Sequence, residues 1–296
     1  MFERKAKSNA SGCASPADHI QKVKDAGETR QLNENMEKIH NKIVVFSGKG
    51  GVGKSTVAVN LAVALAARGY RTGLLDIDIH GPSVPVLLGM NGEKVMADSA
   101  SEKIIPALYN DTLKVVSVGF FLEKMEDAVV WRGPLKYNMI KQFLKDVAWG
   151  ELDYLIIDSP PGTGDEPLSV CQLIKNPDGA LIVTTPQDVA LADVMKSITF
   201  CKMLNMPVIG VIENMSGFVC PHCGGAVDIF KSGGALKMAA DMSVPFLGRI
   251  PLETRISEQA DAGKPFVNTV PSDSSSAQSS FDAIVAKIVQ LKEKQS

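Results

Sequence analysis

The sequence predicts an α/β fold in which a mostly parallel sheet carries helices on both faces. Short apolar runs that are typical of buried strands alternate with longer segments of helical periodicity, and this alternation favours parallel strands joined by helices. A glycine-rich loop lies between the first of these strands and the helix that follows it. We expect strands at Ile43–Phe46, Thr72–Leu75, Val115–Val118, Tyr154–Ile157, Leu181–Thr184, Val208–Ile212 and Phe246–Ile250.

The two ends of the chain differ from this alternating region. Residues 1–40 are polar, charged and poor in aromatic side chains, so we expect a flexible tail there, with a helix near Ile20–Met36. Residues 41–296 then form the folded domain. The Ser-rich segment Pro271–Ser280 is typical of a linker. The last helix is expected to dock on the core through an apolar stripe of Phe281, Ile284, Ile288 and Leu291.

Composition argues against several classes of protein. The formal net charge is -2, which does not favour a nucleic acid or an anionic membrane as the main partner. The longest apolar runs are too short to cross a bilayer. The first residues, MFERKAKSNAS, lack the apolar core of a signal peptide, so we expect a cytoplasmic protein.

The five cysteines do not suggest a disulfide framework, because their number is odd and a cytoplasm keeps thiols reduced. Cys171 and Cys201 lie in apolar helical patterns and are expected to be inert core residues. Cys13 lies in the tail. We expect it to be an exposed thiol without a role, with a transient metal ligand as the alternative.

The glycine-rich loop has the sequence GKGGVGKST, which matches the phosphate-binding pattern G-x-x-x-x-G-K-[ST]. Glycines let successive backbone N–H groups face the phosphates of ATP, and the start of the next helix adds positive potential. We expect Lys54 to reach the β- and γ-phosphates and the Ser55 hydroxyl to bind Mg²⁺. The residues predicted to line the nucleotide are Gly48, Lys49, Gly50, Gly51, Val52, Gly53, Lys54, Ser55 and Thr56.

Two acidic segments, DIDIHGPS and DSPPGTGD, each follow a predicted strand. Carboxylates at the C-terminal ends of parallel strands face the ligand crevice of such a sheet. We expect Asp158 to hold the Mg²⁺ shell, Asp78 to orient the attacking water, and Asp76 to support Mg²⁺ or the loop. The alternative for Asp76 and Asp78 is that they only cap a turn. The segment after Asp158 is typical of a switch that senses the γ-phosphate through the N–H of Gly162 or Gly164.

Cys220 and Cys223 form a C-x-x-C pair in a predicted loop. A redox disulfide is one interpretation, although the pair does not open a helix as a thioredoxin-like motif does. The pair is also consistent with half of a structural zinc site or half of an iron–sulfur site, each of which generally takes four protein ligands. A homodimer with this loop on its two-fold axis supplies four thiols. His222 as a third ligand within one chain is geometrically tight.

With these motifs the chain resembles the Mrp family of iron–sulfur cluster carrier ATPases, within the MinD/ParA-like group that has a deviant Walker A loop. The resemblance covers about residues 38–270. It implies a P-loop ATPase domain over residues 41–296, with the C-x-x-C loop at 220–223. It rests on GKGGVGKST, DIDIHGPS, WRGP at 131–134, DYLIIDSPPGTGDEPLS at 153–169, ENMSGFVCPHCGG at 213–225 and IPLETRISEQADAGKPF at 250–266.

The resemblance also implies roles for single residues. The first lysine of the deviant loop, Lys49, is expected to reach across a dimer interface to the partner's nucleotide. Asn214 is expected to hydrogen-bond adenine, with a purely structural role as its alternative. Cys220 and Cys223 are expected to bind a labile [4Fe–4S] cluster that bridges a homodimer and passes to apoproteins, while a weak Mg²⁺-dependent ATPase serves the transfer. The tail holds only Cys13 where some relatives carry a four-cysteine site, so no second cluster is expected.

Other functions remain open on the same fold. One is an ATPase dimer with a structural zinc at the same cysteines. Another is a positioning ATPase that resembles MinD or ParA and works on a membrane or on DNA. The C-terminal end, Leu291–Ser296, is a poor membrane anchor and no strong basic patch is present, so we expect neither a membrane nor a nucleic-acid partner. A reductase of the nitrogenase iron-protein type is less favoured, because its two cysteines are expected farther apart in sequence.

Overall fold

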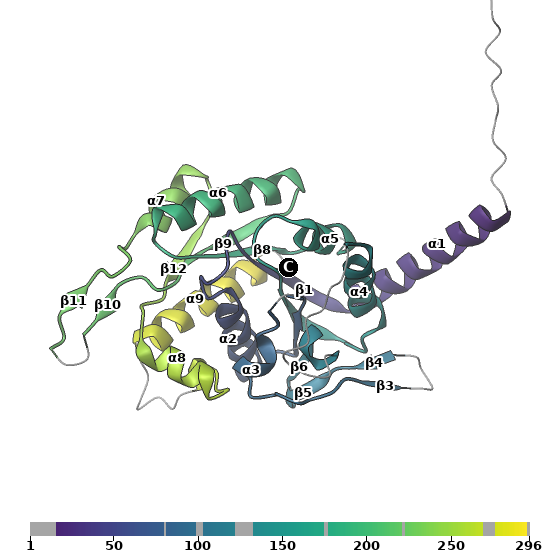
Figure 1. The fold of residues 1–296 in the computed structure, drawn as a ribbon, viewed down its shortest axis with the longest axis horizontal. Coiled ribbons are helices and arrows are strands. Elements are labelled where there is room, and N and C mark those ends of the chain that lie inside the picture. The colour runs from purple at the N-terminus through teal and green to yellow at the C-terminus, as the bar shows by residue number, and fades with distance from the viewer. Residues whose placement is uncertain are drawn as a thin grey trace, which may run out of the picture.

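A central sheet forms the body of the protein. The structure, a computed structural model, describes residues 16–79, 81–98, 103–121, 133–174, 177–220, 223–268 and 276–294, and within them eight strands pair in the order β12-β9-β8-β1-β7-β2-β6-β5 (Figure 1). Every neighbouring pair is parallel except β5 and β6. The strands are β1 (Ile39–Ser47), β2 (Thr72–Asp76), β5 (Ala107–Asn110), β6 (Leu113–Ser117), β7 (Leu152–Asp158), β8 (Gly179–Thr184), β9 (Val208–Glu213) and β12 (Phe246–Arg249).

This arrangement confirms the predicted mostly parallel α/β fold. Each predicted strand overlaps one strand of the sheet, and two of the predictions run one residue past the end of the observed strand. Val118 begins the 3₁₀ turn η1 (Val118–Phe121) instead of ending β6, and Ile250 follows β12. Strand β5, at the edge of the sheet, was not predicted, because its short sequence alternates between half-buried and exposed residues without an apolar run.

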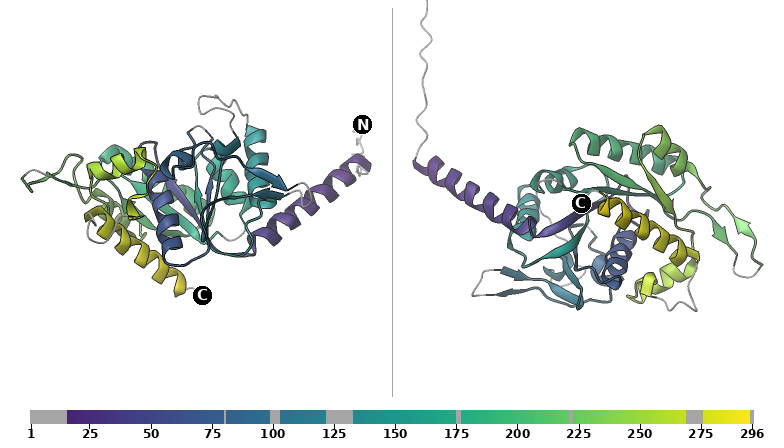
Figure 2. Two further views of the ribbon diagram at one scale, coloured as in Figure 1. Left: turned by 90° about the horizontal axis from the view of Figure 1, so that it is seen from below. Right: turned by 180° about the vertical axis from the view of Figure 1, so that it is seen from behind.

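Helices cover both faces of the sheet, as predicted (Figure 2). Each face has its own set, because residues that alternate along a strand point to opposite sides. One face carries α1 (Pro16–Met36), α4 (Gly133–Asp146), α5 (Asp165–Leu173), α6 (Asp188–Met203) and α7 (Gly234–Asp241). The other carries α2 (Lys54–Ala67), α3 (Val84–Leu87), α8 (Thr254–Asp261), the 3₁₀ turn η2 (Phe266–Asn268) and α9 (Ser276–Glu293).

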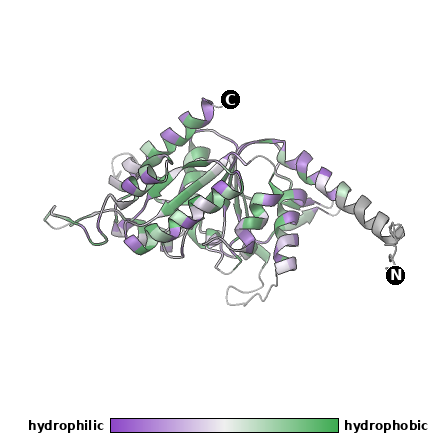
Figure 3. Ribbon diagram, turned by 90° about the horizontal axis from the view of Figure 1, so that it is seen from above, coloured by the Kyte–Doolittle hydropathy of each residue, from purple (hydrophilic) through white to green (hydrophobic). Residues whose placement is uncertain are grey.

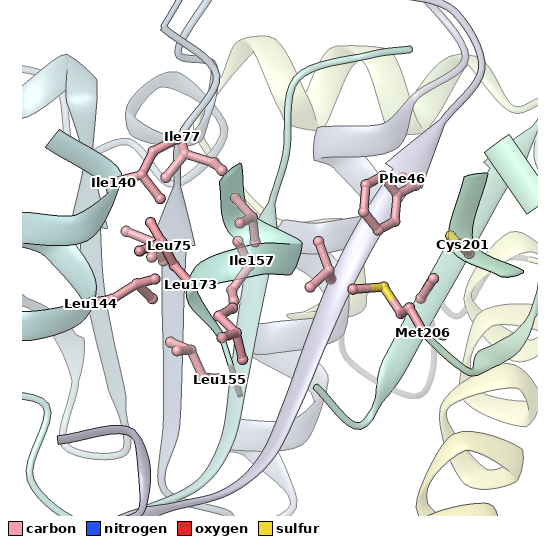
Figure 4. Close-up of a cluster of buried hydrophobic side chains, with 14 of the residues drawn as sticks. Phe46, Leu75, Ile77, Ile140, Leu144, Leu155, Ile157, Leu173, Cys201 and Met206 are labelled. Carbon is pink, nitrogen blue, oxygen red and sulfur yellow. The ribbon is translucent and has the colours of Figure 1, made fainter. Parts of the chain in front are cut away.

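The sheet separates two hydrophobic core clusters. Along β1, Val44 and Phe46 face the first cluster, and Ile43 and Val45 face the second. Figure 4 shows Phe46 in the first cluster among side chains from the neighbouring strands and helices. Figure 3 shows that hydrophobic residues are concentrated in the central strands. Strands that are buried on both faces are nearly continuous apolar runs, which is why the sequence predicts them.

The packed body begins before the boundary that we expected at residue 41. Helix α1 contains the predicted helix, and its last turn buries Leu32 and Met36. The side-chain amide of Asn35 donates hydrogen bonds of 2.8 and 3.0 Å to the carbonyl oxygens of Leu144 and Val147, which satisfies the end of α4. The remainder of the expected flexible tail, residues 1–15 with Cys13, lies outside the described residues.

Two short hairpins leave the sheet. One pairs β3 (Met96–Asp98) with β4 (Lys103–Ile105). The other pairs β10 (Phe218–Val219) with β11 (Ala226–Val227) and extends away from the body at the end opposite to α1 (Figure 1). Neither hairpin was predicted, because strands of two or three residues carry no periodic signal.

The last helix packs on the second core cluster. Phe281, Ile284 and Ile288 are buried, and the Phe281 ring meets the Phe266 ring edge-on at 5.3 Å between centroids. Leu291 is half-buried at the margin of this cluster. Among the helices of the described residues, none combines the length and the apolar content that a membrane crossing requires.

Candidate functional site

The phosphate loop lies at the C-terminal edge of the sheet. Strand β1 runs between β7 and β8, and the chain passes from its end through the loop into α2. Gly51 and Gly53 have φ angles of 79° and 82°, in the left-handed region where other side chains are strained. Gly53 also packs so closely on the Asn214 amide that a Cβ would collide with it. Backbone conformation therefore favours glycine at both positions, and space excludes any larger residue at Gly53.

A pocket of about 250 Å³ lies over this loop. Nothing lies within 4 Å of the place a Cβ would take on Gly50 or Gly51, so the backbone there is accessible to a ligand. Two predicted loop residues do not line the pocket, since Gly48 packs on the backbone of Asp193 in α6 and Val52 is buried. The lining residues are Ser47, Lys49, Gly50, Gly51, Gly53, Lys54, Ser55, Thr56, Asp78, Ser83, Leu87 and Pro161.

Lys54 lies below the loop among carboxylates. Its Nζ is 2.5 Å from Oδ1 of Asp158 and 3.9 Å from Oδ2 of Asp78, and it donates to the Ser55 hydroxyl at 3.2 Å. The Lys54 side chain is only 6% exposed, so this ammonium group depends on its partners to offset the loss of water. The structure thus brings together residues that the sequence assigned to phosphate, metal and water binding.

Asp76 and Asp158 end neighbouring strands, and the parallel register of β2 and β7 places them side by side. The Asp76 carboxylate accepts hydrogen bonds from the Ser117 hydroxyl at 2.8 Å and from the N–H of Asp78 at 3.0 Å. Burial, and then the charge of Asp158, raise the pKa of Asp76 to about 7, although these hydrogen bonds and Lys54 favour its ionised form. By accepting the N–H of Asp78, Asp76 caps the turn that follows β2, which is the alternative role that we considered for it.

The donor set around Lys54 fits Mg²⁺. Oδ2 of Asp158 is buried and has no hydrogen-bond partner among the described atoms, which is unusual for a buried polar atom. Several carboxylates share one ammonium group, so the site favours a further cation. No three His, Cys, Asp or Glu side chains of the described residues gather closely enough to hold a metal ion alone. This agrees with Mg²⁺ sites that combine one or two carboxylates with water and substrate phosphates.

Two neighbouring segments hold the loop in place. The N–H of Gly162 donates to the Ser47 carbonyl oxygen at 2.8 Å, so this predicted γ-phosphate sensor contacts the chain itself. The Asn214 side-chain amide donates to the Val52 carbonyl oxygen at 2.9 Å. The structural role that we kept as the alternative for Asn214 is thus present, and the adenine contact stays a prediction.

Both cysteines of the C-x-x-C pair lie at the tip of the β10–β11 hairpin. The N–H of Cys220 donates to the Gly225 carbonyl oxygen, and the N–H of Gly224 donates to the Cys220 carbonyl oxygen, both at 2.9 Å. Cys220 is half-buried and Cys223 is exposed. His222, the third ligand that we considered, lies outside the described residues, as do His80 and the WR residues of WRGP. The cysteine pair is therefore held on a tight turn outside the phosphate pocket.

Cys171 and Cys201 have the environment that we expected for inert core residues. Cys201 is buried, and Cys171 is half-buried against the first core cluster. Burial raises the pKa of each thiol to about 12, which keeps both protonated at neutral pH.

A second hollow of about 480 Å³ joins the phosphate loop to the segment that follows the hairpin. Lys49 lines this hollow as well as the phosphate pocket. Val189 is 68% exposed and Ile229 is 51% exposed, and both line it too. Lys231, at its edge, pairs with Asp188 at 2.6 Å. We call this surface the Lys49 groove.

Sequence reasoning assigned no role to Ser117 or Glu213. Ser117 ends β6 and binds Asp76, but a serine at the end of an apolar strand gives no specific signal. Glu213 ends β9 and is completely buried. A charged residue is rarely fully buried without partners. The position of Glu213 directly after an apolar run could therefore have predicted a buried carboxylate with hydrogen-bond partners.

The loop between β1 and α2, with carboxylates at the ends of β2 and β7, defines a P-loop NTPase. The two lysines of its loop place it in the deviant Walker A group. The chain belongs to the family described as ParA, NUBPL iron-transfer P-loop NTPase, whose model matches residues 38–289. This confirms the resemblance to iron–sulfur cluster carrier ATPases that the motifs indicated.

Relatives are similar over most of their length. A Methanocaldococcus jannaschii protein named iron-sulfur cluster carrier protein is 52% identical over 265 residues, which cover 90% of this chain and 89% of the relative. A Culex quinquefasciatus protein named cytosolic Fe-S cluster assembly factor NUBP2 homolog is 51% identical over 238 residues, which cover 80% of this chain and 93% of the relative.

Solved structures share the fold. The nucleotide-binding protein from Archaeoglobus fulgidus in complex with ADP has a TM-score of 0.71 and 42% identity, covering 80% of this chain and 92% of its own. The cell division ATPase MinD from Pyrococcus furiosus has a TM-score of 0.62 and 26% identity, covering 85% of this chain and 99% of its own. Both matches support the assignment to nucleotide-binding P-loop proteins.

Proposed function

We propose that this protein is an iron–sulfur cluster carrier. Its cargo is a labile [4Fe–4S] cluster, held by Cys220 and Cys223 and passed to apoproteins. The observation that carries the proposal is the position of both cysteines on a tight turn at the tip of a hairpin outside the body, where two such turns can meet. The names of relatives that are 52% and 51% identical, a cluster carrier and a cluster assembly factor, support it.

The proposal requires a homodimer, because one chain offers two thiols on this turn and a [4Fe–4S] cluster generally takes four. Lys49 lies between the phosphate pocket and the groove that leads toward the hairpin. A dimer that joins this face therefore brings Lys49 to the partner's nucleotide. We propose a cytoplasmic location, supported by the word cytosolic in the name of the Culex quinquefasciatus relative, with apoproteins rather than nucleic acid or membrane as partners.

ATP is proposed to lie along the loop from Gly48 to Thr56. Backbone N–H groups of the open Gly50–Gly51 segment face its phosphates. The side-chain nitrogen of Asn214 donates to the Val52 carbonyl oxygen of the loop. Its side-chain oxygen is then the proposed acceptor for the adenine amino group.

We also propose weak, Mg²⁺-dependent ATP hydrolysis in service of cluster transfer. Lys54, which pairs with Asp158 in this structure, would bind the β- and γ-phosphates, and Asp158, Ser55 and Asp76 would hold the Mg²⁺ shell. Asp78, which lines the phosphate pocket, orients the attacking water. Mg²⁺, when bound, supplies charge neutralisation for the phosphates.

Anaerobic reconstitution with iron and sulfide tests the cargo. We expect about four iron and four sulfide per two chains, a brown dimer and little zinc. In Cys220→Ser/Cys223→Ser, bound iron should fall to background. Cys171→Ser/Cys201→Ser is the matched control, because it also removes two thiols but leaves the hairpin intact. Equal iron in the hairpin variant would refute the proposal, and stoichiometric zinc in wild-type protein purified without oxygen would favour the structural-zinc alternative.

A further inference from the structure

The segment that carries the cysteine hairpin is attached to the body at its two ends. The chain leaves β9 at Glu213, runs out through β10 and the cysteine turn, and returns through β11 to α7 at Gly234 (Figure 1). Between these points, none of the described residues belongs to either core cluster. One bridge pairs Phe218 with Leu252 near the base. The position of the cysteines therefore depends mainly on polar contacts at the base of the hairpin.

One carboxylate holds both ends of this hairpin segment. Oε1 of Glu213 accepts hydrogen bonds from the Ser216 hydroxyl at 2.5 Å and from the N–H of Gly233 at 2.9 Å. Oε2 accepts a hydrogen bond from the N–H of Ala235 at 2.7 Å, and Nε of Arg249 lies 3.4 Å from Oε1. Ser216 precedes the hairpin, whereas Gly233 and Ala235 follow it. Glu213 therefore fixes the two ends relative to each other.

The next residue in the chain holds the phosphate loop. Asn214 donates from its side-chain amide to the Val52 carbonyl oxygen and from its backbone N–H to the Thr184 carbonyl oxygen, at 2.9 and 2.7 Å. Gly53 packs directly on the same amide. One peptide bond thus separates a contact with the phosphate loop from the carboxylate that fixes the hairpin.

We propose that Glu213 is a positioning residue that couples the nucleotide site to the cysteine pair. Movement of the phosphate loop passes through Asn214 to Glu213 and changes the placement of Cys220 and Cys223. This inference rests on the proposed function, in which those thiols hold the cargo. The coupling itself concerns only the nucleotide and the reduced thiols, so it can be measured without a cluster. A site shared by two chains needs such support, because ligands that are loosely held do not keep a productive geometry.

The test measures how ATP changes thiol reactivity in the full chain. Reduced apoprotein is alkylated with iodoacetamide with and without Mg²⁺ and ATP, and mass spectrometry gives the rates at Cys220 and Cys223. The buried Cys201 serves as an internal reference for intact structure. In wild-type protein we expect ATP to change the rates by at least about fivefold, the lower end of typical coupling between two sites. In Glu213→Gln we expect ATP to bind but to change them by less than about twofold.

Glu253→Gln is the matched control. Glu253 also accepts hydrogen bonds from a hydroxyl and an N–H, those of Ser276 and Ala277 at 2.7 and 2.8 Å, but it does so at the start of α9. It should keep the wild-type response to ATP. If circular dichroism shows that Glu213→Gln is unfolded, Ser216→Ala removes a single donor to Glu213 and should weaken the response.

Three results would overturn the coupling. They are a full ATP response in a folded Glu213 or Ser216 variant, an equal loss of response in Glu253→Gln, and wild-type protein that binds ATP without any change in alkylation. A failed reconstitution with iron and sulfide would instead contradict the cluster carrier function, because the alkylation experiment contains neither.

Discussion

Lys49 and Lys54 belong to one loop but have different surroundings. Lys54 is 6% exposed and pairs with Asp158 of its own chain. Lys49 lines the phosphate pocket and the Lys49 groove, where it can reach a neighbouring molecule. We therefore expect substitution of the two lysines to have different effects. Loss of Lys54 should weaken phosphate binding within one chain, whereas loss of Lys49 should slow ATP hydrolysis at the nucleotide of the partner chain.

Lys49→Ala should leave ATP binding nearly unchanged and lower kcat for ATP hydrolysis about a thousandfold, the lower end of what a cation supplied across an interface contributes. Calorimetric titration with ATP and a phosphate-release assay measure the two quantities. Lys231→Ala is the control, since Lys231 lines the same groove but pairs with Asp188. An unchanged kcat in Lys49→Ala would show that this lysine does not act on the nucleotide.

At the scale of elements, the sequence predicted the segments whose burial is uniform. Ile43–Phe46 is apolar throughout because β1 is covered on both faces. The phosphate loop and Asp158 were predictable because their motifs are continuous in sequence. The β10–β11 hairpin was not, since Val219 and Val227 are more than half exposed and its strands have two residues each.

Contacts between segments that are distant in sequence could not be predicted either. Asn214 and Val52 are 162 residues apart, and no local pattern joins them. Glu213 gains the N–H donors of Gly233 and Ala235 only when the chain returns to the end of β9 at the start of α7. Helix α1 gives a third example: its polar composition favoured a tail, but Leu32 and Met36 are enough to pack its last turn against the body.

Helix α9 makes the stability of the second core cluster testable. Phe281→Ala should lower the free energy of unfolding by about 3–5 kcal/mol, because it leaves a cavity beside Phe266. Urea denaturation followed by circular dichroism measures the change. Gln290→Ala, on the exposed side of the same helix, should stay within about 0.5 kcal/mol of wild type. A small effect of Phe281→Ala would mean that α9 is not part of the cooperative core.

At the scale of the whole molecule, the chemical groups gather at one edge of the sheet. The phosphate loop follows β1, the carboxylates end β2 and β7, and the cysteine hairpin follows β9. The Lys49 groove lies between the loop and the hairpin, with Val189 and Ile229 exposed to solvent. We propose a second chain at both of these sites, and exposed apolar side chains between them are typical of an association surface.

Val189→Asp should therefore weaken self-association in the presence of ATP by at least about tenfold in Kd, because it places a charge in an apolar contact. Sedimentation velocity over a range of protein concentrations measures this change. Met203→Asp is the matched control: Met203 is 77% exposed at the other end of α6, about 21 Å along the helix from Val189. Equal behaviour of the two variants would exclude the Lys49 groove from the interface.

Because none of the described residues between Glu213 and Gly234 belongs to a core cluster, the hairpin can change without endangering the fold. Exposed tips of this kind tolerate insertion and replacement, and they are where a scaffold acquires new chemistry. Evolution could therefore exchange the ligands on this tip while the ATPase body stays the same. For the same reason, a hairpin carrying other metal-binding residues could be grafted between Ser216 and Gly233 as an interchangeable part.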